Sequence, residues 1–196
     1  MESEHTFRVL VGVILLLGLA IRAYYLRAAT RHGARAQTIE SRLSRTLQAL
    51  FYTIASCLIV AYIVFPGLIS RSALHLPEWL RWVGVFLGFL CLPLLVWVHR
   101  SLDLNCSFVL SIREDHTLVT CGPYSRIRHP MYAVWYVLHF SLFLMTANWL
   151  VGAYMVGVYT LPIALRMREE EAMLIQRFGD AYRDYMRRTG RLLPRC

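Results

Sequence analysis

Arginine, histidine and tyrosine side chains lie at the start of an apolar stretch, in the segment GPYSRIRHPMYAVWYV from Gly122 to Val137. Pro130 suits the first turn of a helix, where the missing N–H costs little. His129 is then expected at or near the N-cap, with Arg128 just outside the helix and Tyr132 inside the first turn. Because the N-terminus of a helix attracts anions, this segment predicts a polar site for anionic groups.

A second charged group follows the last apolar stretch, in the segment LRMREEEAMLIQRFGDAYRDYMRRTGRLLP. Arg166 ends the apolar part and Glu169–Glu171 follow it. Gly179 is expected to end one helical piece and Asp180 to cap the next. Apolar side chains then recur at helical spacing and form one stripe, at Leu174, Phe178, Tyr182 and Tyr185. A solvated helix with local ion pairs would by itself explain three successive glutamates.

The elements that position these groups follow from the composition, which is 57% hydrophobic and 17% charged. Such a chain has too little polar sequence to cover a soluble core of this size. A bilayer core of about 30 Å takes about 20 helical residues. The apolar runs therefore predict an all-α integral membrane fold of one domain, 1–196, with five transmembrane helices at about residues 7–26, 47–69, 79–98, 130–146 and 149–166.

One feature of this arrangement has a second interpretation, and another has a consequence for the two polar groups. Arg22 interrupts the first apolar run, which could instead be a signal peptide, although no small-residue cleavage pattern follows it. The fourth and fifth runs are separated only by Ala147–Asn148, which predicts a tight turn. Such a hairpin places Arg128–Tyr132 and Arg166–Glu171 at the same face of the membrane, so the two polar groups are expected to meet.

Arginines set the predicted orientation, because the chain has no lysine and carries a net charge of +9. They concentrate in the first and third loops and in the C-terminal tail. The positive-inside rule then places the N-terminus outside and the C-terminus in the cytoplasm, in the inner membrane of a prokaryote or the endoplasmic reticulum of a eukaryote. Attraction to anionic membrane lipids explains the charge better than nucleic acid does, since the arginines form no single patch.

The third loop and the tail complete the predicted architecture. Residues 101–129 alternate weakly and turn at Gly122–Pro123, which predicts a re-entrant-type cytoplasmic loop. Residues 167–190 are expected to form an amphipathic segment on the same face. No GxGxxG follows a strand, so no Rossmann domain is expected. The five cysteines form no CxxC pair and the histidines no HxxH, so no metal site is predicted.

Two motifs together resemble the isoprenylcysteine carboxyl methyltransferase family, which belongs with the phospholipid N-methyltransferases. They are HTLVTCGPYSRIRHPMY and EEAMLIQRFGDAYRDYMRRTGRLLP, and they cover roughly His116 to Pro194. The order of the motifs around a helical hairpin is specific, whereas RHPxY alone also occurs in membrane sterol reductases. The first three predicted spans match the family only in being apolar, not in any sequence motif.

The resemblance implies methyl transfer from S-adenosylmethionine at the membrane surface, with S-adenosylhomocysteine as product. It implies a wall for the adenosine at His116, Thr117, Leu118 and Val119. It implies that the methionine end is enclosed by Tyr124, His129, Pro130, Met131 and Tyr132. Glu170 would pair with the amino group of the cofactor, with Arg128 opposite it. Arg166 would face the methyl acceptor, and Arg128 could hold either carboxylate.

The acceptor is expected to be a prenylcysteine-like or other lipophilic carboxylate that enters from the bilayer. A carboxylate is already ionised at neutral pH and needs no general base, and a guanidinium matches its geometry. An amine would require deprotonation, so N-methylation of a phospholipid or small amine is the alternative. A sterol-type reductase with a nicotinamide cofactor and a non-catalytic scaffold are further alternatives. Val134 stands where the family often has glycine, which puts the acceptor in question. No oligomeric state is predicted.

Overall fold

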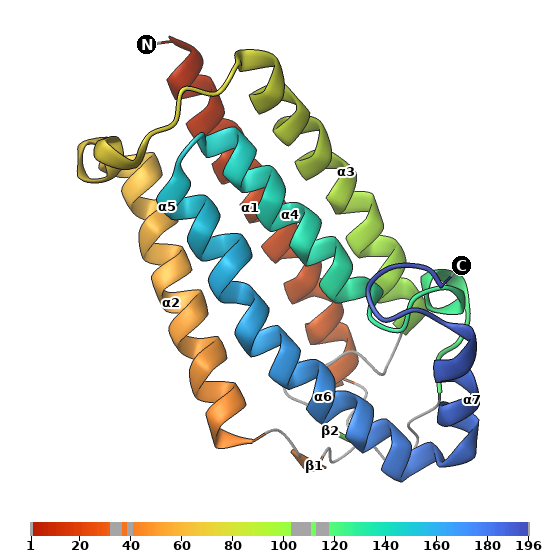
Figure 1. Cartoon of the computed structure of the whole chain (residues 1–196). Helices are drawn as coiled ribbons and strands as arrows, with labels where there is room; N and C mark the ends of the chain where they lie inside the picture. The colour runs from red at the N-terminus through yellow and green to blue at the C-terminus, as the bar shows by residue number, and fades with distance from the viewer. Residues whose placement is uncertain (1, 32–36, 39–40, 103–110, 113–117, 196) are drawn as a thin grey trace.

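The computed structural model describes residues 2–31, 37–38, 41–102, 111–112 and 118–195. Long helices form a bundle, and a pair of two-residue strands lies at one end of it (Figure 1). In chain order the main elements are α1 (Glu2–Arg31), β1 (Gln37–Thr38), α2 (Arg42–Val64), α3 (Glu78–Leu102), β2 (Ser111–Ile112), α4 (Pro130–Thr146), α5 (Trp149–Gly152), α6 (Tyr159–Phe178) and α7 (Asp180–Arg188). Strands β1 and β2 pair antiparallel, with Gln37 opposite Ile112.

Irregular helical turns join some of these elements. Two are short 3₁₀ helices, at Pro66–Ser72 and Gly122–Ser125. A π-helical turn at Ala153–Val158 connects α5 to α6, so that one helix runs from Trp149 to Phe178. Helix α2 ends at Val64, before the predicted limit of residue 69, because the residue preceding Pro66 is disfavoured in the helical conformation.

Among the described residues, four helices are long and apolar enough to cross a membrane, over Ser3–Ala28, Arg42–Val64, Glu78–Leu102 and Trp149–Phe178. Helix α4 is a shorter apolar helix of 17 residues, and its bounds are those predicted for the fourth span. The all-α membrane class is thereby confirmed, while the count of five spans stays a prediction. Arg22 does not break α1, which is continuous from Glu2 to Arg31.

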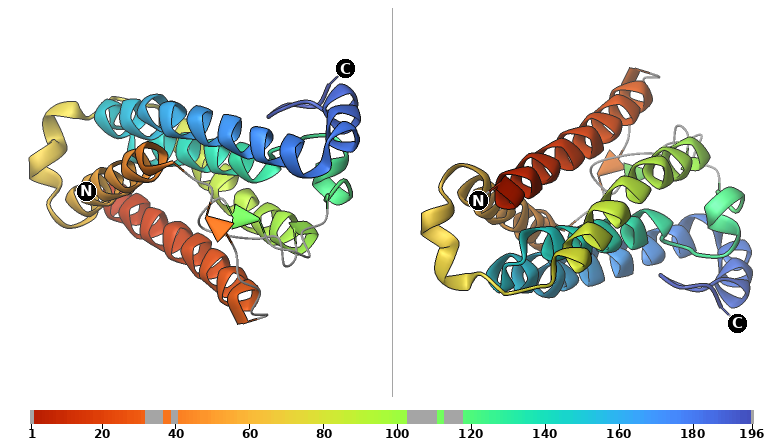
Figure 2. Two further views of the ribbon diagram at one scale, coloured as in Figure 1. Left: turned by 90° about the horizontal axis from the view of Figure 1, so that it is seen from below. Right: turned by 90° about the horizontal axis from the view of Figure 1, so that it is seen from above.

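Glycines on α3 allow α4 and α1 to pack closely against it. A Cβ atom at Gly84 would lie 2.8 Å from Leu144 Cβ, and one at Gly88 would lie 2.8 Å from Ile14 Cδ1 of α1. Small residues bring membrane helices together in this way because backbones can approach and make van der Waals contact. Helix α4 therefore lies in the interior of the bundle, between α3 and the helix that runs from Trp149 to Phe178 (Figure 2).

The predicted tight turn between α4 and α5 is confirmed. Ala147 adopts a left-handed conformation with φ 45°, and its N–H donates to Phe143 O at 3.0 Å. The side chain of Asn148 caps α5 by accepting from Val151 N at 3.2 Å, and its Nδ2 donates to Ile69 O at 3.0 Å. The chain reverses here, so the start of α4 and the end of α6 lie at the same end of the bundle (Figure 1).

The predicted fifth span and the start of the predicted amphipathic segment lie on one continuous helix. Helix α6 continues past residue 166 and ends only at Phe178, because no glycine or proline interrupts residues 167–178. The chain turns at Gly179, whose φ of 54° suits glycine, and this part of the prediction is confirmed. Asp180 does not cap α7. It lies in the first turn of that helix and pairs with Arg183 at 2.8 Å.

Candidate active site

The two predicted polar groups meet at the end of the bundle where α4 begins and α6 ends, here called the site end. The hydroxyl of Tyr132 donates to Glu170 Oε2 at 2.8 Å. The hydroxyl oxygen of Tyr132 also accepts from Arg166 Nε at 2.9 Å. The expectation that the hairpin brings these groups together is therefore confirmed. Helix α4 supplies the tyrosine and α6 supplies both charged partners, one turn apart.

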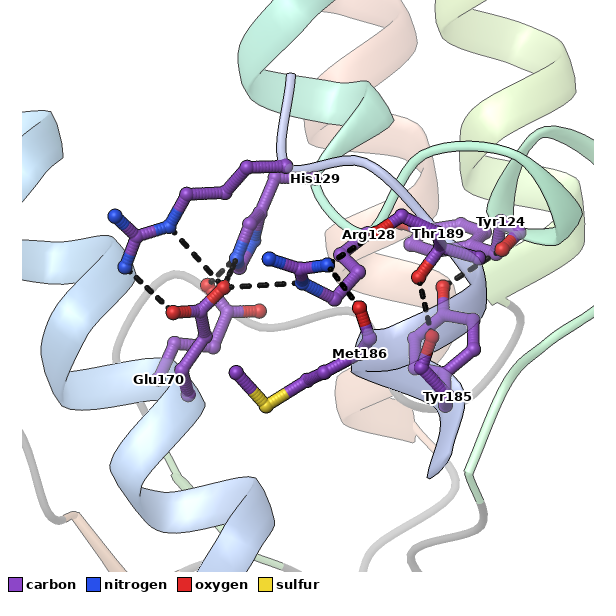
Figure 3. Close-up of polar contacts among 9 residues, drawn as sticks. Tyr124, Arg128, His129, Glu170, Tyr185, Met186 and Thr189 are labelled. Carbon is purple, nitrogen blue, oxygen red and sulfur yellow. Dashed lines mark hydrogen bonds and ion pairs between the residues drawn. The ribbon is translucent and has the colours of Figure 1, made fainter. Parts of the chain in front are cut away.

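Glu171 is the centre of a second cluster, which extends to the C-terminal tail. Its carboxylate is buried and accepts from Arg128 Nε at 3.2 Å and from Arg191 Nε at 3.1 Å. Arg191 Nη2 donates to the second carboxylate oxygen. His129 Nε2 lies 3.2 Å from Oε1, and Figure 3 shows Arg128 and His129 directed toward the carboxylates of α6. Three basic side chains therefore share one acidic group.

The charge of Glu171 follows from these contacts. The residue lies beyond Arg166, where the apolar part of the helix ends. Burial by itself raises the pKa of Glu171, but hydrogen bonds from His129 and Arg191 and their positive charges outweigh it and lower the pKa to about 2. Glu171 is therefore ionised at neutral pH and balances the surrounding cations.

Arg128 also fixes the tail against the start of α4. Its Nη1 donates to Met186 O at 3.1 Å and to Thr189 O. Its backbone N–H donates to Gly190 O at 2.8 Å, and that of His129 donates to Arg191 O at 3.0 Å. These contacts stay within the chain, so the catalytic role of Arg128 stays a prediction while its place in the tail contact is observed.

The other predicted site residues surround this region to different degrees. Tyr124 is buried, and its carbonyl accepts from Tyr185 OH at 2.7 Å, which ties the loop to α7. Met131 Sδ accepts from Arg22 Nη1 of α1 at 3.4 Å. The remaining predicted residues with a described position are buried or half-buried, at Leu118, Val119, His129 and Pro130. His116 and Thr117 lie outside the described residues.

Three polar residues of the site carry no predicted role. Glu171 belongs to a run of three glutamates, which indicates a charged region but does not show which of the three binds the neighbouring basic side chains. Arg191 matches the tail motif, which gives it no chemistry. Gln48 of α2 accepts from Arg166 Nη1 at 2.8 Å through its Oε1. Gln48 is an isolated polar residue next to an apolar run, and no spacing pattern in the sequence singles it out.

Replacing Glu171 with glutamine is expected to destabilise the protein by about 3 kcal/mol, because the guanidinium of Arg128, with 11% of its side chain exposed, loses its counter-charge. For a chain of this size that corresponds to a fall of about 6–12 °C in the apparent unfolding temperature, measured in detergent by tryptophan fluorescence. Glu78→Gln, at the exposed start of α3, is the control and should change little. A Glu171→Gln protein that unfolds at the wild-type temperature would contradict this role.

The same variant makes a pH prediction with a definite sign. Because the pKa of Glu171 is lowered from 4.5 to about 2 in the folded protein, its contribution to stability is present above pH about 4.5. The contribution is lost as the pH falls toward 2. The difference in unfolding temperature between wild type and Glu171→Gln should therefore be largest near neutral pH and shrink steadily below pH about 4.5.

Comparison with known proteins supports the resemblance stated from the sequence. The family model described as "Isoprenylcysteine carboxyl methyltransferase (ICMT) family" matches residues 82–176, which include α4 and Arg166–Glu171. The cobalt-zinc-cadmium resistance protein CzcN of Cupriavidus metallidurans is 34% identical over 121 residues, covering 59% of this chain and 54% of that protein. The protein-S-isoprenylcysteine O-methyltransferase of Schizosaccharomyces pombe is 31% identical over 112 residues, covering 55% of this chain and 48% of that protein.

The mouse protein-S-isoprenylcysteine O-methyltransferase is 38% identical over 85 residues, which cover 41% of this chain and 29% of the mouse protein. The chain thus spans about half the length, or less, of these curated relatives. A solved structure of the eukaryotic intramembrane Ras methyltransferase ICMT superimposes with a TM-score of 0.55 at 23% identity, covering 80% of this chain and 54% of that one. At this identity the match supports the fold.

Proposed function

We propose that this chain, which matches the isoprenylcysteine carboxyl methyltransferase family over residues 82–176, is an integral membrane methyltransferase that uses S-adenosylmethionine. Its expected reaction is O-methylation of a prenylcysteine-like or other lipophilic carboxylate that reaches the site from the bilayer. The observation that carries the proposal is the contact between Tyr132, Glu170 and Arg166, which joins both motifs of the family in one polar site.

The residues at the site end fit the charges of the cofactor. Its amino group is a cation, and the carboxylate of Glu170 is partly exposed, with 28% of the side chain accessible. Its carboxylate is an anion, and α4 begins beside Glu170 with His129 at the N-cap and Pro130 in its first turn. Among the described residues, no side chain caps the N–H groups of this turn. Those N–H groups suit a bound carboxylate.

Each residue then has a proposed part in the reaction. When bound, the cofactor supplies an electrophilic methyl group. Tyr132 holds Glu170 in place, and Glu170 binds the ammonium of the cofactor. Leu118 and Val119, with His116 and Thr117, provide the adenosine wall, and Tyr124 helps to enclose the methionine end. Arg166 orients the carboxylate of the acceptor by one oxygen and leaves the other free to attack, so alignment and exclusion of water do most of the work.

The proposed orientation places the site end in the cytoplasm and the N-terminus outside. Cys121 is exposed at the site end and lies just before the 3₁₀ helix Gly122–Ser125. A membrane-impermeant thiol reagent should therefore modify Cys121 only in inverted vesicles, in a variant whose other four cysteines are replaced by serine. Modification in right-side-out vesicles or intact cells would reverse the assigned orientation.

The decisive experiment is transfer of a labelled methyl group from S-adenosylmethionine by the purified chain in lipid nanodiscs. The acceptors are an S-farnesylcysteine analogue, phosphatidylethanolamine and a small amine. Base-labile label on the farnesylcysteine supports carboxyl methylation. Label found only on an amine would show that the acceptor is an amine and not a carboxylate. If no acceptor is labelled and S-adenosylhomocysteine does not bind, the proposal that the chain is a methyltransferase is refuted.

A further inference from the structure

The first turns of α2 form a third side of the site, and they lie outside the segment that the family model matches. Ser41 is the N-cap of α2, and its Oγ accepts from Ser44 N at 3.1 Å. The same hydroxyl donates to Glu169 Oε1 of α6 at 2.5 Å. The N-terminus of α2 is thus held against the charged part of α6, beside Arg166.

Gln48 lies one turn further along α2 and contacts Arg166 directly. Its Oε1 accepts from Arg166 Nη1 at 2.8 Å, and its Nε2 donates to Ser44 Oγ at 3.2 Å. An arginine can only donate, so the amide oxygen must face the guanidinium and the amide nitrogen must face the serine. Arg166 therefore fixes the orientation of the amide, and Ser44 holds the amide nitrogen at its other end.

The guanidinium of Arg166 is consequently held at two of its nitrogens. Tyr132 of α4 binds Nε, and Gln48 of α2 binds Nη1. The Arg166 residue is buried, with 7% of its surface exposed, so a change of rotamer would cost these contacts. Tyr132 and Gln48 are uncharged, so these two contacts orient the guanidinium without adding a counter-charge of their own.

From this geometry we infer that Gln48 is a positioning residue that aims Arg166 at the carboxylate of the methyl acceptor and makes the site select anionic acceptors over amines. The inference rests on the proposed function, in which Arg166 faces the acceptor. A glutamate at this position would keep the hydrogen bond to Arg166 but would compete with the acceptor for its charge. A neutral amide does not compete, and this difference makes the inference testable.

The test compares Gln48→Met, Gln48→Glu and wild type in the full chain, with an S-farnesylcysteine analogue as acceptor. Gln48→Met should raise the KM for this acceptor about tenfold, the loss expected for one hydrogen bond to a charged group. Gln48→Glu should raise it further, and the rise should weaken with added salt. The KM for S-adenosylmethionine should stay within about twofold. Gln176→Met and Gln176→Glu, at an exposed position of α6, are the matched controls.

The outcomes separate this inference from the proposed function. An active wild type with Gln48 variants of unchanged acceptor KM would overturn the inference alone. So would a near-normal Gln48→Glu beside an impaired Gln48→Met, because the glutamine would then only support the fold. Loss of S-adenosylhomocysteine binding in both variants would also assign Gln48 to the fold. A wild type without methyl transfer to the farnesylcysteine refutes the proposed acceptor, and the inference with it.

Discussion

Replacing Glu170 with alanine will abolish measurable binding of S-adenosylhomocysteine. The proposed role of this carboxylate is to pair with the ammonium of the cofactor, and charge-assisted hydrogen bonds are about twice as strong as neutral ones. A loss of about 3 kcal/mol of binding free energy corresponds to a dissociation constant more than about 100-fold higher. Isothermal titration calorimetry with the purified protein in detergent measures this directly. Methyl transfer should fall in parallel at fixed cofactor concentration.

Glu170→Gln sharpens the test, because an amide oxygen can still accept from Tyr132 OH but carries no charge. It should bind the cofactor product almost as weakly as the alanine variant, while its unfolding temperature stays near that of wild type. Asp180→Asn, at an exposed position after the same helix, is the control for loss of one negative charge. Unchanged affinity in Glu170→Gln would defeat the assignment of Glu170 to the ammonium.

The hairpin was predictable because local signals mark both of its ends. Pro130 is best tolerated in the first turn of a helix, and Ala147–Asn148 interrupts a run that is otherwise apolar. The structure begins α4 at the first and ends it before the second. Once the chain reversed at that turn, both polar groups lay at the same end of the bundle (Figure 1).

The rotation of α6 was not predictable, and it decides which glutamate meets which cation. Consecutive helical residues point about 100° apart, so Glu170 and Glu171 face different neighbours. The expectation from the sequence was that Arg128 lies opposite Glu170. In the structure Arg128 donates to Glu171, and Glu170 accepts from Tyr132. Side-chain packing sets this rotation, since Met167 and Met173 on α6 are both buried.

Contacts between residues far apart in the chain could not be predicted from the sequence either. Gln48 and Arg166 are 118 positions apart, and no spacing links them. Arg191 reaches Glu171 because the tail beyond α7 returns to the start of α4, where Gly190 and Arg128 share a backbone hydrogen bond. A turn at Gly179 was expected, but the path of the chain after it depends on tertiary contacts.

Replacing Arg166 with alanine should remove turnover while the affinity for S-adenosylhomocysteine changes by less than about threefold. In the proposed mechanism Arg166 handles the acceptor, and Glu170 handles the cofactor. Removing one oriented charged donor from an enclosed site costs about 10²–10³ in turnover. The rate of labelled methyl transfer to an S-farnesylcysteine analogue measures the first effect, and calorimetry measures the second.

Arg166→Lys distinguishes charge from geometry at the same position. A lysine keeps the positive charge but cannot replace a planar guanidinium that is held by Tyr132 at Nε and by Gln48 at Nη1. It should therefore recover only a small part of the lost turnover. Near-normal turnover in Arg166→Ala would show that Arg166 does not handle the acceptor. Loss of both S-adenosylhomocysteine binding and turnover would instead assign Arg166 to the cofactor site. Its role would then be to hold Tyr132, which in turn holds Glu170.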